Sequence, residues 1–441
     1  MLAVVVSRAD RASEHIGERL LALGDWTDHE DADRADAAGG GTYYRTGGAE
    51  LRTFDELHIR AEGLAEAFDD PDLLFVASRH SGDTGPLLTA HPTGNPGPAE
   101  FGGEAESFAR AAPNALSALL SAFDEHAPEG YGVAMECTHH GPTDLDVPSL
   151  FVELGSDDEQ WDDPEGASAV ARAILDCRGV APDRERQLVG FGGGHYAPRF
   201  ERVVRETDWA VGHVLADWSL EDMAHPREAR GVVAAAFERS AAEHALVEGD
   251  RPVLREVIDD LGYRVVSETW ARETTGVPLG TVEELESALA PVDEGLRFGD
   301  PGAGYEGEFA TTELPAELVE EAANVDTGAA RDAVAGVALA FETEQGGTRP
   351  VGRVALAPGA TPDDLVAALA DVLRAKYDTV EIADGAVLAR EETFVPEKAA
   401  TLGVGEGPAF GKLAAGEAVE VDGRTIEPHA VHEERELRFA Y

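Results

Sequence analysis

Residues 73–85 read LLFVASRHSGDTG, and this stretch contains the two patterns that decide the fold. The apolar run LLFVAS has the length of a strand, and Arg79, His80 and two glycines follow it at once. A short, continuous apolar run bounded by turn residues is typical of a strand buried on both faces of its sheet. Apolar runs of this kind alternate with helical patterns over the first 265 residues. The sequence therefore predicts an α/β domain.

Six apolar runs are predicted to be strands: residues 2–7, 73–78, 132–138, 150–154, 187–191 and 210–215. Two of the intervening segments carry clear helix patterns. Asp163 before Pro164 is typical of an N-cap followed by proline at the first helical position. Residues 116, 119, 120 and 123 form an apolar stripe with helical spacing. We expect a mostly parallel sheet with helices on both faces.

Histidines cluster in the same part of the chain. Six of the fourteen lie between residues 80 and 195. Five of these lie in four short motifs rich in Gly or Pro: SRHSGDTG (78–85), LTAHPTGN (88–95), ECTHHGP (136–142) and GFGGGHYAPR (190–199). Three motifs directly follow predicted strands. Ligands of open α/β sheets bind at the carboxyl ends of the strands, so we expect these segments to meet in one crevice. Imidazole is a common zinc ligand and acid/base group, which favours a metal-assisted enzyme.

The chain is extremely acidic. It has 35 Lys and Arg against 86 Asp and Glu, a formal net charge of −51, and its only lysines are Lys376, Lys398 and Lys412. Repulsion among so many negative charges opposes compact folding in dilute buffer. In molar salt the Debye length falls to about 3 Å, and this repulsion is largely screened. We therefore expect a halophilic protein of a high-salt cytosol. An acidic disordered chain is the alternative, but 43% hydrophobic residues favour a packed core.

Length and cysteine content limit the organisation. The 441 residues suffice for two or three domains, and we expect a catalytic domain over residues 1–270 and an acidic extension over 271–441. The two cysteines, Cys137 and Cys177, do not suggest a disulfide framework. The sequence shows neither a signal peptide nor an apolar run of about 20 residues. We expect a cytoplasmic monomer that binds neither a membrane nor a protein partner.

Several motifs are absent from the sequence. It has no GxxxxGK[ST], HExxH, GxSxG or CxxC pattern. GFGGGHY also lacks the third glycine of the dinucleotide fingerprint, so nucleotide cofactor binding has weak support. The glycines 192–194 favour either close approach of the backbone to a phosphate or sugar, or simple turn flexibility.

Adjacent histidines pose a geometric question. If His139 and His140 continue a strand, their side chains point to opposite faces, and both reach one metal only if the Gly141-Pro142 turn redirects one of them. Glu136 shares a strand face with His140. A carboxylate beside imidazoles is a ligand, an orienting group or a general base, and the alternative for Glu136 is an ion-paired core residue.

Four ordered stretches resemble one known family, the archaeal and plant type D-aminoacyl-tRNA deacylases. They are residues 78–103, residues 136–156, Trp161 and residues 190–199, and the similarity covers roughly residues 1–265. The resemblance implies a zinc-dependent hydrolase with two ions per subunit, which cleaves the ester between a D-amino acid and the 3′ ribose of tRNA. It also implies a fold similar to peptidyl-tRNA hydrolases and purine nucleoside phosphorylases.

The family's motif histidines correspond to His80, His91, His139, His140 and His195, with Glu136 as the accompanying carboxylate. From donor chemistry we expect zinc to be held by His80, His91, His139, His140 and Glu136, with a position left for water. Glu136, His140 and His195 are the expected catalytic residues. The expected substrate contacts are Ser81, Thr89 and Asn95 to the amino acid or ribose, and Tyr196 and Arg199 to the terminal adenosine.

Two other functions remain open at this stage: a zinc-free nucleoside phosphorylase or nucleosidase, and a noncatalytic tRNA-binding protein with a structural metal site. An arginine-rich stretch (Arg184, Arg186, Arg199, Arg202 and Arg205) is either a local positive surface for tRNA or a set of helix salt bridges.

The second half of the chain is less informative. FGDPGAGYEG (298–307) is a linker candidate, residues 308–400 read as a small acidic α/β segment, and residues 363–373 as a helix. Residues 402–431 alternate turns and short strands. They resemble a short segment of tRNA 3′-end processing hydrolases, which makes contact with tRNA one hypothesis; a β-hairpin that closes the domain is the other.

Overall fold

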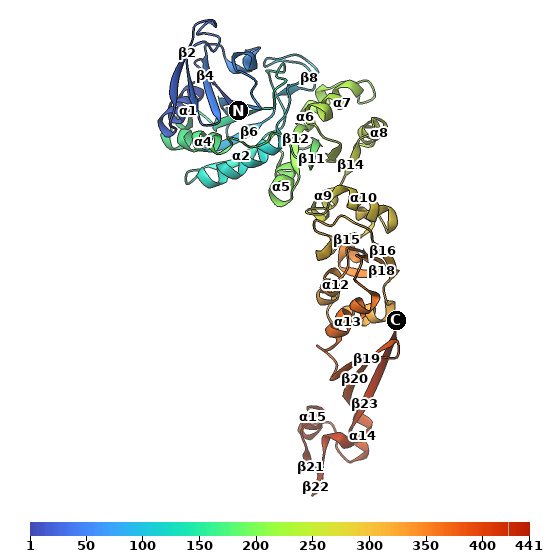
Figure 1. Ribbon diagram of the computed structural model, residues 1–441. Helices are drawn as coiled ribbons and strands as arrows, with labels where there is room; N and C mark the ends of the chain where they lie inside the picture. Colours follow the sequence, from blue (N-terminus) through green and yellow to red (C-terminus); the bar gives the residue numbers. More distant parts are fainter. Residues whose placement is uncertain (422) are drawn as a thin grey trace. The chain divides into compact units, whose positions relative to one another are not determined.

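The computed structural model describes residues 1–421 and 423–441 of the chain, which divide into two compact units, Met1–Thr275 and Gly276–Tyr441. Figure 1 labels their helices and strands. The FGDPGAGYEG stretch, expected as a linker, lies inside the second unit instead. Its backbone is tied to neighbouring segments there, since Gly299 N donates to Leu339 O (3.0 Å) and Gly304 N donates to Gly276 O (2.8 Å).

An eight-stranded sheet forms the centre of the first unit. In spatial order its strands are β2 (Thr27–Asp31), β3 (Gly41–Thr46), β4 (Ala49–Phe54), β1 (Leu2–Ser7), β5 (Leu73–Arg79), β10 (Ser149–Gly155), β6 (Leu87–His91) and β9 (Gly132–Met135). The four central strands β4, β1, β5 and β10 are all parallel. This arrangement confirms the predicted α/β class with a mostly parallel sheet.

One end of this sheet reverses direction. β6 is antiparallel to β10, and β9 is parallel to β6, so β9 points opposite to β5. β5 and β9 therefore end in opposite directions, and the expectation that the motifs share one carboxyl edge of the sheet is wrong. A pattern of apolar runs gives the positions of strands but carries no information about their direction.

Three helices cover one face of the sheet. α1 (Arg11–Leu23) and α2 (Pro113–His126) both pack against α4 (Pro164–Asp176), and Figure 1 shows the three side by side. α4 begins as predicted, because the Asp163 side chain accepts a hydrogen bond from Glu165 N and Pro164 takes the first position. The apolar stripe of α2, residues 116, 119, 120 and 123, is buried.

The other face packs against the segment that follows β4. This segment contains two short 3-10 helices, η1 (His58–Arg60) and η2 (Leu64–Ala67). Leu64 and Phe68 from it join Val5, Val76 and Phe151 of the sheet in one hydrophobic cluster. The packing also fixes His58 beside the sheet, with its ring 5.1 Å from that of Phe151.

A second, fully parallel sheet completes the first unit, in the order β12 (Ala210–Leu215), β11 (Gln187–Phe191), β13 (His244–Val247) and β14 (Arg264–Val266). Its helices are α5 (Pro198–Glu206), α6 (Asp217–Asp222), α7 (Arg230–Arg239), α8 (Pro252–Asp260) and α9 (Glu268–Glu273). The two sheets are joined at the chain after β9, where Cys137 N donates to His195 O (2.7 Å) and Thr138 N to Val214 O (2.9 Å). These bonds bring the ECTHHGP and GGGHY motifs together.

The remaining short elements of the first unit connect these layers. They are α3 (Asp158–Trp161) and the strand pair β7 (Gly94–Asn95) and β8 (Ser107–Phe108).

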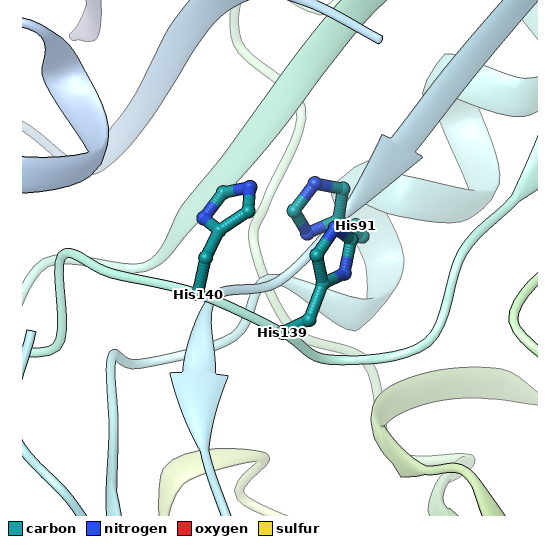
Figure 2. Close-up of side chains that lie close together, drawn as sticks. All are labelled: His91, His139 and His140. Atoms are coloured by element: carbon teal, nitrogen blue, oxygen red, sulfur yellow. The ribbon is translucent and has the colours of Figure 1, made fainter. Parts of the chain in front are cut away.

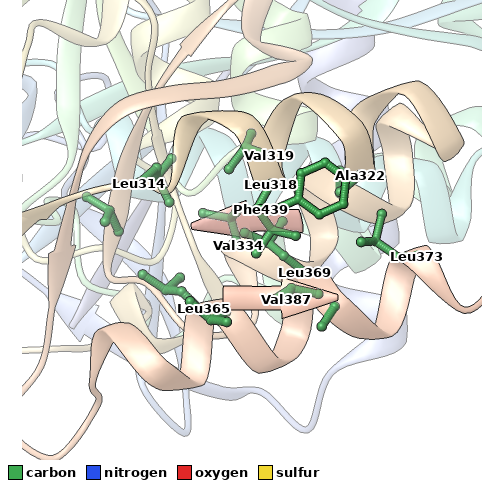
Figure 3. Packing of buried hydrophobic residues seen from close by; sticks show 14 of the residues in the cluster. Leu314, Leu318, Val319, Ala322, Val334, Leu365, Leu369, Leu373, Val387 and Phe439 are labelled. Atoms are coloured by element: carbon green, nitrogen blue, oxygen red, sulfur yellow. The ribbon is translucent and has the colours of Figure 1, made fainter. Parts of the chain in front are cut away.

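The second unit has an antiparallel sheet in the order β15 (Leu296–Phe298), β17 (Ala340–Glu344), β18 (Arg349–Leu356) and β16 (Ala310–Glu313). A three-stranded sheet follows, with β19 (Thr379–Ala383), β20 (Ala386–Phe394) and β23 (His432–Ala440). Its helices are α10 (Leu279–Ala288), α11 (Ala316–Val325), α12 (Thr327–Ala335) and α13 (Pro362–Leu373), with 3-10 turns η3 (Val292–Glu294), η4 (Asp300–Gly302) and η5 (Gln345–Gly347). Figure 3 shows the core between helices and strands, including Leu318, Leu369 and Phe439.

A small separate core closes the second unit. It contains Ala399, Leu413 and Ile426 and is built by α14 (Pro396–Thr401), α15 (Pro408–Ala414), the pair β21 (Val419–Val421) and β22 (Arg424–Ile426), and η6 (Pro428–Ala430). The expected hairpin is present, but residues 408–414 form a helix rather than a turn. In the described part of the chain, no helix is both long and apolar enough to cross a bilayer.

Candidate metal centre and catalytic cavity

A cavity of about 510 Å³ opens in the first unit, and most of the predicted site residues line it. The lining includes His80, Ser81, Asn95, Glu136, His139, His140 and His195. In the described chain, His91, Tyr196 and Arg199 are not part of this lining. The volume is in the usual range for a site that takes a small molecule or one end of a larger one.

Three imidazoles form a compact group at the cavity. Figure 2 shows His91 at the end of β6 beside His139 and His140, which follow β9. The ring centroids of His91 and His139 are 4.1 Å apart, and those of His139 and His140 are 4.5 Å apart. One nitrogen from each ring lies within 4.8 Å of the other two, so a single metal ion could be held by all three.

Backbone carbonyls fix the proton positions on these rings. Nδ1 of His91 contacts the carbonyl of Pro92 (3.2 Å), Nδ1 of His139 that of Cys137 (2.8 Å), and Nδ1 of His140 that of Gly141 (2.7 Å). A carbonyl oxygen only accepts, so each Nδ1 carries the hydrogen and donates it. In its neutral form, a ring held in this way presents the lone pair of Nε2. Such carbonyl contacts are typical of the outer partners of metal-binding histidines.

Burial keeps two of these rings neutral. It lowers the pKa of His139 to about 4, helped by the neighbouring His91. Burial likewise holds the pKa of His140 well below its usual value, with His139 as the next cause. Metal ligation requires neutral imidazole, so the electrostatics of the apoprotein already favour the binding form at neutral pH.

The backbone at His140 explains how adjacent histidines face the same way. Its φ is +43°, in the left-handed region that non-glycine residues seldom adopt. This reverses the strand-like alternation, so the His140 ring lies 4.5 Å from that of His139 instead of on the opposite face. The left-handed turn thus performs the redirection that the sequence left open.

Glu136 is the hub of a second group. Its carboxylate is fully buried and lies 2.9 Å from His80 Nδ1 and 2.8 Å from His195 Nε2. His139 Nε2 lies 3.7 Å away, so the two groups adjoin. The contact explains how two strands of opposite direction build one site: His80 follows β5, and Glu136 continues β9 by donating its N–H to Ala90 O (3.1 Å).

These contacts set the charges of the second group. Burial by itself disfavours the carboxylate of Glu136, but hydrogen bonds from His195 and His80 hold its pKa well below the usual value. Burial also lowers the pKa of His80, yet Glu136 and Glu153 outweigh it and raise that pKa to about 10. Contacts with Cys137 and then Glu136 raise the pKa of His195 to about 10. Without a metal, His80 and His195 are therefore protonated at neutral pH.

Glu153 is a site residue that the predicted set lacked, although its position at the end of a strand was visible. It is buried, and its carboxylate accepts from Ser78 Oγ (2.9 Å) and lies 3.6 Å from His80 and 3.7 Å from His91. Burial disfavours its charge, but contacts from His80 and His91 keep its pKa below the usual value. Glu153 thus connects the two histidine groups from the side of β10.

Cys137 falls in the strand predicted over residues 132–138, but β9 ends at Met135 and Cys137 lies beside the site. Its Sγ is 3.7 Å from His195 Nδ1, and Cys137, His139 and His195 form another set whose ligand atoms lie within 4.8 Å of one another. His80, Glu136 and Glu153 form a third such set. The expected two ions thus have three sets of possible ligands available, two of which share His139.

Unpartnered atoms support the fit of a cation. Within residues 1–421 and 423–441, buried His91 Nε2 makes no aligned hydrogen bond and lies 3.7 Å from Glu153. Buried Glu136 Oε1 lies 2.9 Å from His80 Nδ1, but this contact is not aligned as a hydrogen bond. Buried polar atoms are rarely left without a partner, because each one costs roughly 1–3 kcal/mol. Imidazole nitrogen and carboxylate oxygen are the donors that zinc takes. The residues present therefore fit a divalent metal.

A close approach holds His80 in place. A Cβ built at Gly155 would lie 2.7 Å from the Cβ of His80, too near for any side chain. Nε2 of His80 contacts the hydroxyl of Tyr196 (3.1 Å), and its backbone carbonyl accepts from Trp161 Nε1 (3.0 Å). The hydroxyl contact ties Tyr196 to His80, and the expected contact of Tyr196 with the terminal adenosine stays a prediction.

Other predicted residues have structural partners. Asn95 lines the cavity, but its amide donates to the carbonyls of Gly102 (2.9 Å) and Glu104 (3.1 Å) and so fixes a loop. Thr89 donates toward Glu153 (3.5 Å). Ser81 lines the cavity and is exposed.

The arginine-rich stretch pairs with acidic groups. Glu268 of α9 accepts from Arg199 (3.2 Å) and Arg202 (2.7 Å), Arg186 pairs with Asp208 (3.1 Å), and Arg205 with Glu201 (2.6 Å). Arg184 donates to Asn114 (2.8 Å). These contacts match the salt-bridge alternative more closely than a free positive surface.

The glycine turn after β11 is likewise bound to an acidic side chain, that of Asp217. Gly193 N donates to Asp217 Oδ1 (3.0 Å), and Asp217 N donates back to Gly193 O (2.9 Å). A carboxylate in this place repels a phosphate. Gly192 and Gly193 have φ of +98° and +82°, so the turn itself requires glycine.

Sequence patterns gave no signal for four other residues that line the cavity. Phe101 and Trp218 are 63% and 44% exposed, unusual for large apolar side chains. Asp10 and His58 are buried in its wall. Each comes from a segment outside the histidine motifs.

Comparison with known proteins places the chain among named relatives. A family model described as D-aminoacyl-tRNA deacylase matches residues 67–266. A protein of Natronomonas pharaonis is 61% identical over 100% of both chains, and one of Halorubrum lacusprofundi is 55% identical over 100% of this chain and 96% of its own. A Haloarcula marismortui protein is 52% identical over 100% of both chains. All three relatives are named D-aminoacyl-tRNA deacylase.

A solved structure supports the fold. It is a crystal structure of a conserved protein of unknown function, with a TM-score of 0.56 and 28% sequence identity. The similarity covers 62% of this chain and 98% of that one.

Proposed function

The chain belongs to the D-aminoacyl-tRNA deacylase family, and from that premise we propose that it hydrolyses the ester bond of D-aminoacyl-tRNA in a metal-dependent reaction. Water adds across the ester, so the products are a free D-amino acid and tRNA with its 3′-terminal hydroxyl restored. The observation that carries the metal dependence is the close approach of one ring nitrogen each from His91, His139 and His140, all within 4.8 Å of one another.

The proposed metal residues are His91, His139 and His140 for one ion, and His80, Glu136 and Glu153 for a second. Zinc suits the first set, because neutral imidazoles held through Nδ1 are its common ligands. When bound, such an ion supplies Lewis acidity toward the ester carbonyl and lowers the pKa of water. This assignment retains the predicted metal residues and adds Glu153.

His195 is the proposed proton donor. It lines the cavity, its side chain is 36% exposed, and its raised pKa of about 10 keeps it protonated at neutral pH in the apoprotein. It can therefore give a proton to the leaving ribose oxygen. Glu136 acts on His195 as a positioning residue, since its carboxylate accepts from Nε2 (2.8 Å). His140, which was expected in both the catalytic and the metal-holding set, is assigned to the metal-holding set alone.

The mouth of the cavity suits the end of a nucleic acid. Phe101 and Trp218 expose aromatic faces there, and bases stack on such faces whatever their sequence. We assign the terminal adenosine to these rings rather than to Arg199, whose guanidinium is bound to Glu268. All lining residues belong to Met1–Thr275, so the chemistry is assigned to that unit, and contact with the body of the tRNA to Gly276–Tyr441.

High salt removes an apparent conflict between the charge of −51 and a polyanionic substrate. In molar salt, repulsion is screened within about 3 Å, and counterion release contributes little to binding. Local stacking and hydrogen bonds then determine affinity. We place the protein in a high-salt cytosol, in line with its haloarchaeal relatives.

The test is deacylation in molar KCl. The purified protein is expected to release D-tyrosine from D-tyrosyl-tRNA, to lose this activity when a chelator removes its metal, and to regain it with zinc. Undiminished turnover by protein shown to be metal-free would remove the metal from the proposal. No hydrolysis of any D-aminoacyl-tRNA by metal-loaded protein would reject the function.

A pair of histidine variants separates the loss of a metal ligand from the effect of replacing any histidine. His139→Gln is expected to lower the bound zinc, measured by elemental analysis, and to lose most activity. His126→Gln is the control, because His126 pairs with Asp176 (2.6 Å) outside the cavity lining. Equal metal content in both variants would reject the assignment of His139.

A further inference from the structure

Asp10 and His58 form a second polar site in the wall of the same cavity. Asp10 is fully buried and His58 is 2% exposed. Asp10 Oδ2 lies 3.3 Å from His58 Nε2 and 3.6 Å from Arg79 Nε. The pair comes from the start of α1 and from η1, which belong to none of the four histidine motifs.

This site has unused hydrogen-bonding capacity. Among the described residues, Asp10 Oδ2 and both ring nitrogens of His58 are buried without an aligned hydrogen bond. The other carboxylate oxygen is occupied, because Asp10 Oδ1 accepts from Ser13 N (2.9 Å) and caps α1. Buried unpaired groups of this kind are costly and usually have a partner, so this wall is built for a ligand.

The buried atoms without an aligned hydrogen bond suit a ligand that donates hydrogen bonds. An ionised carboxylate only accepts, and a neutral imidazole that turns its Nε2–H toward Asp10 leaves Nδ1 as a second acceptor. Arg79 does not satisfy Oδ2, since its Nε lies beyond hydrogen-bond distance and its guanidinium lies over the ring of Trp161 (5.3 Å). Two acceptors, one of them charged, match an ammonium group, which has three donors and a positive charge.

An aminoacyl ester carries such a group beside its reacting bond. The α-ammonium is attached to the carbon next to the scissile carbonyl, so its site must lie in the cavity that holds the hydrolytic residues. We propose, on the premise of the proposed function, that Asp10, positioned with His58, binds the free α-ammonium group of the substrate. The cavity then favours a substrate with an α-ammonium group and fixes the orientation of its α-carbon.

The test compares D-tyrosyl-tRNA with N-acetyl-D-tyrosyl-tRNA, which has the same ester but no ammonium group. The full-length, zinc-loaded protein in molar KCl is expected to show a kcat/KM at least about tenfold higher for the free amine. Asp10→Asn is expected to lower kcat/KM for the free amine by roughly 10- to 100-fold and to leave the acetylated substrate unchanged.

The substitution is chosen to preserve the helix cap, because Asn is as good an N-cap as Asp. Asp163→Asn is the matched control: Asp163 caps α4 in the same way and is not among the described lining residues. It should alter neither substrate's kcat/KM. Circular dichroism and the thermal midpoint confirm that each variant is folded.

Several results would overturn the inference. Equal hydrolysis of both substrates by the wild-type protein would do so without any variant and would leave the deacylase function standing. An equal loss on both substrates in Asp10→Asn would show a merely structural role. If the wild-type protein hydrolyses neither substrate, the proposed function itself fails.

Discussion

At the scale of single residues, three carbonyl groups decide what the cavity's histidines can do. The carbonyls of Pro92, Cys137 and Gly141 each hold one Nδ1–H, which leaves Nε2 as the available nitrogen of each ring. His80 and His195 instead contact the carboxylate of Glu136, and both carry protons in the apoprotein. Identical side chains thus differ in protonation because of their partners.

Trp218 offers a residue-scale test of substrate placement. Trp218→Ala is expected to raise KM for D-aminoacyl-tRNA by roughly 5- to 100-fold, since stacking one base is worth about 1–3 kcal/mol. Because the ring takes no part in the proposed proton transfer, kcat should change little. Steady-state kinetics give both constants.

Trp218→Phe is the matched comparison, because it keeps an aromatic face and should retain most of the affinity. Should both variants bind the substrate like the wild-type protein, the terminal base must lie elsewhere.

At the scale of elements, the sequence indicated where strands lie but not which way they run. The expected strands at residues 2–7, 187–191 and 210–215 are present with those bounds. The reversal of β6 and β9 was not predictable, because burial on both faces gives the same apolar run in either direction. His80 and Glu136 nevertheless lie 2.9 Å apart, although β9 runs in the direction opposite to β5.

The site could be predicted only in part, for a related reason. Histidines in Gly/Pro-rich motifs stand out in a sequence, and five of them do gather around Glu136 and the cavity. Asp10 and His58 lie outside these motifs. In the sequence, Asp10 reads as a helix N-cap and His58 as a residue of a short turn, so neither suggests a binding site. Their shared place in the cavity wall depends on the packing of η1 against the sheet, which no local pattern encodes.

The second sheet permits a test of pH dependence. His244 begins β13 and stacks on Trp270 (5.3 Å); burial, followed by Arg264, lowers its pKa to about 4. A depressed pKa means that the unfolded chain takes up the proton first, so His244 contributes stability above about pH 6.5 and loses it as the pH falls toward 4.

His244→Phe keeps an aromatic ring between the tryptophans and removes this titration. The free energy of unfolding should then decrease less between pH 6.5 and 4, by about 1–2 kcal/mol relative to wild type. Denaturant unfolding at several pH values measures it. Parallel pH profiles for the two proteins would show that His244 titrates normally.

At the scale of the whole molecule, the charge of −51 sets the working conditions. Many acidic groups have an arginine partner, such as Glu268 with Arg202 (2.7 Å) and Glu342 with Arg353 (2.7 Å). With 35 basic against 86 acidic residues, most carboxylates nevertheless lack a basic partner of their own. Their mutual repulsion opposes the compact state unless salt screens it.

The thermal midpoint is therefore expected to rise steeply as KCl increases from 0.1 M, where the Debye length is about 10 Å, to above 1 M, where it is about 3 Å or less. Melting curves followed by circular dichroism measure this. If screening is the cause, the gain levels off at high concentration and depends on ionic strength. A larger gain with potassium sulfate at equal ionic strength would identify exclusion of the salt from the surface instead.

The hydrogen bond from Cys137 N to His195 O joins segments from different sheets, and it has a consequence for biosynthesis. A polypeptide still being translated lacks the proposed proton donor until codon 195 has been read and the second sheet has begun to form. On the proposed function, unfinished chains are therefore expected to be inert toward the aminoacyl-tRNAs that surround them at the ribosome. Catalysis is expected to begin only after that stretch has left the exit tunnel.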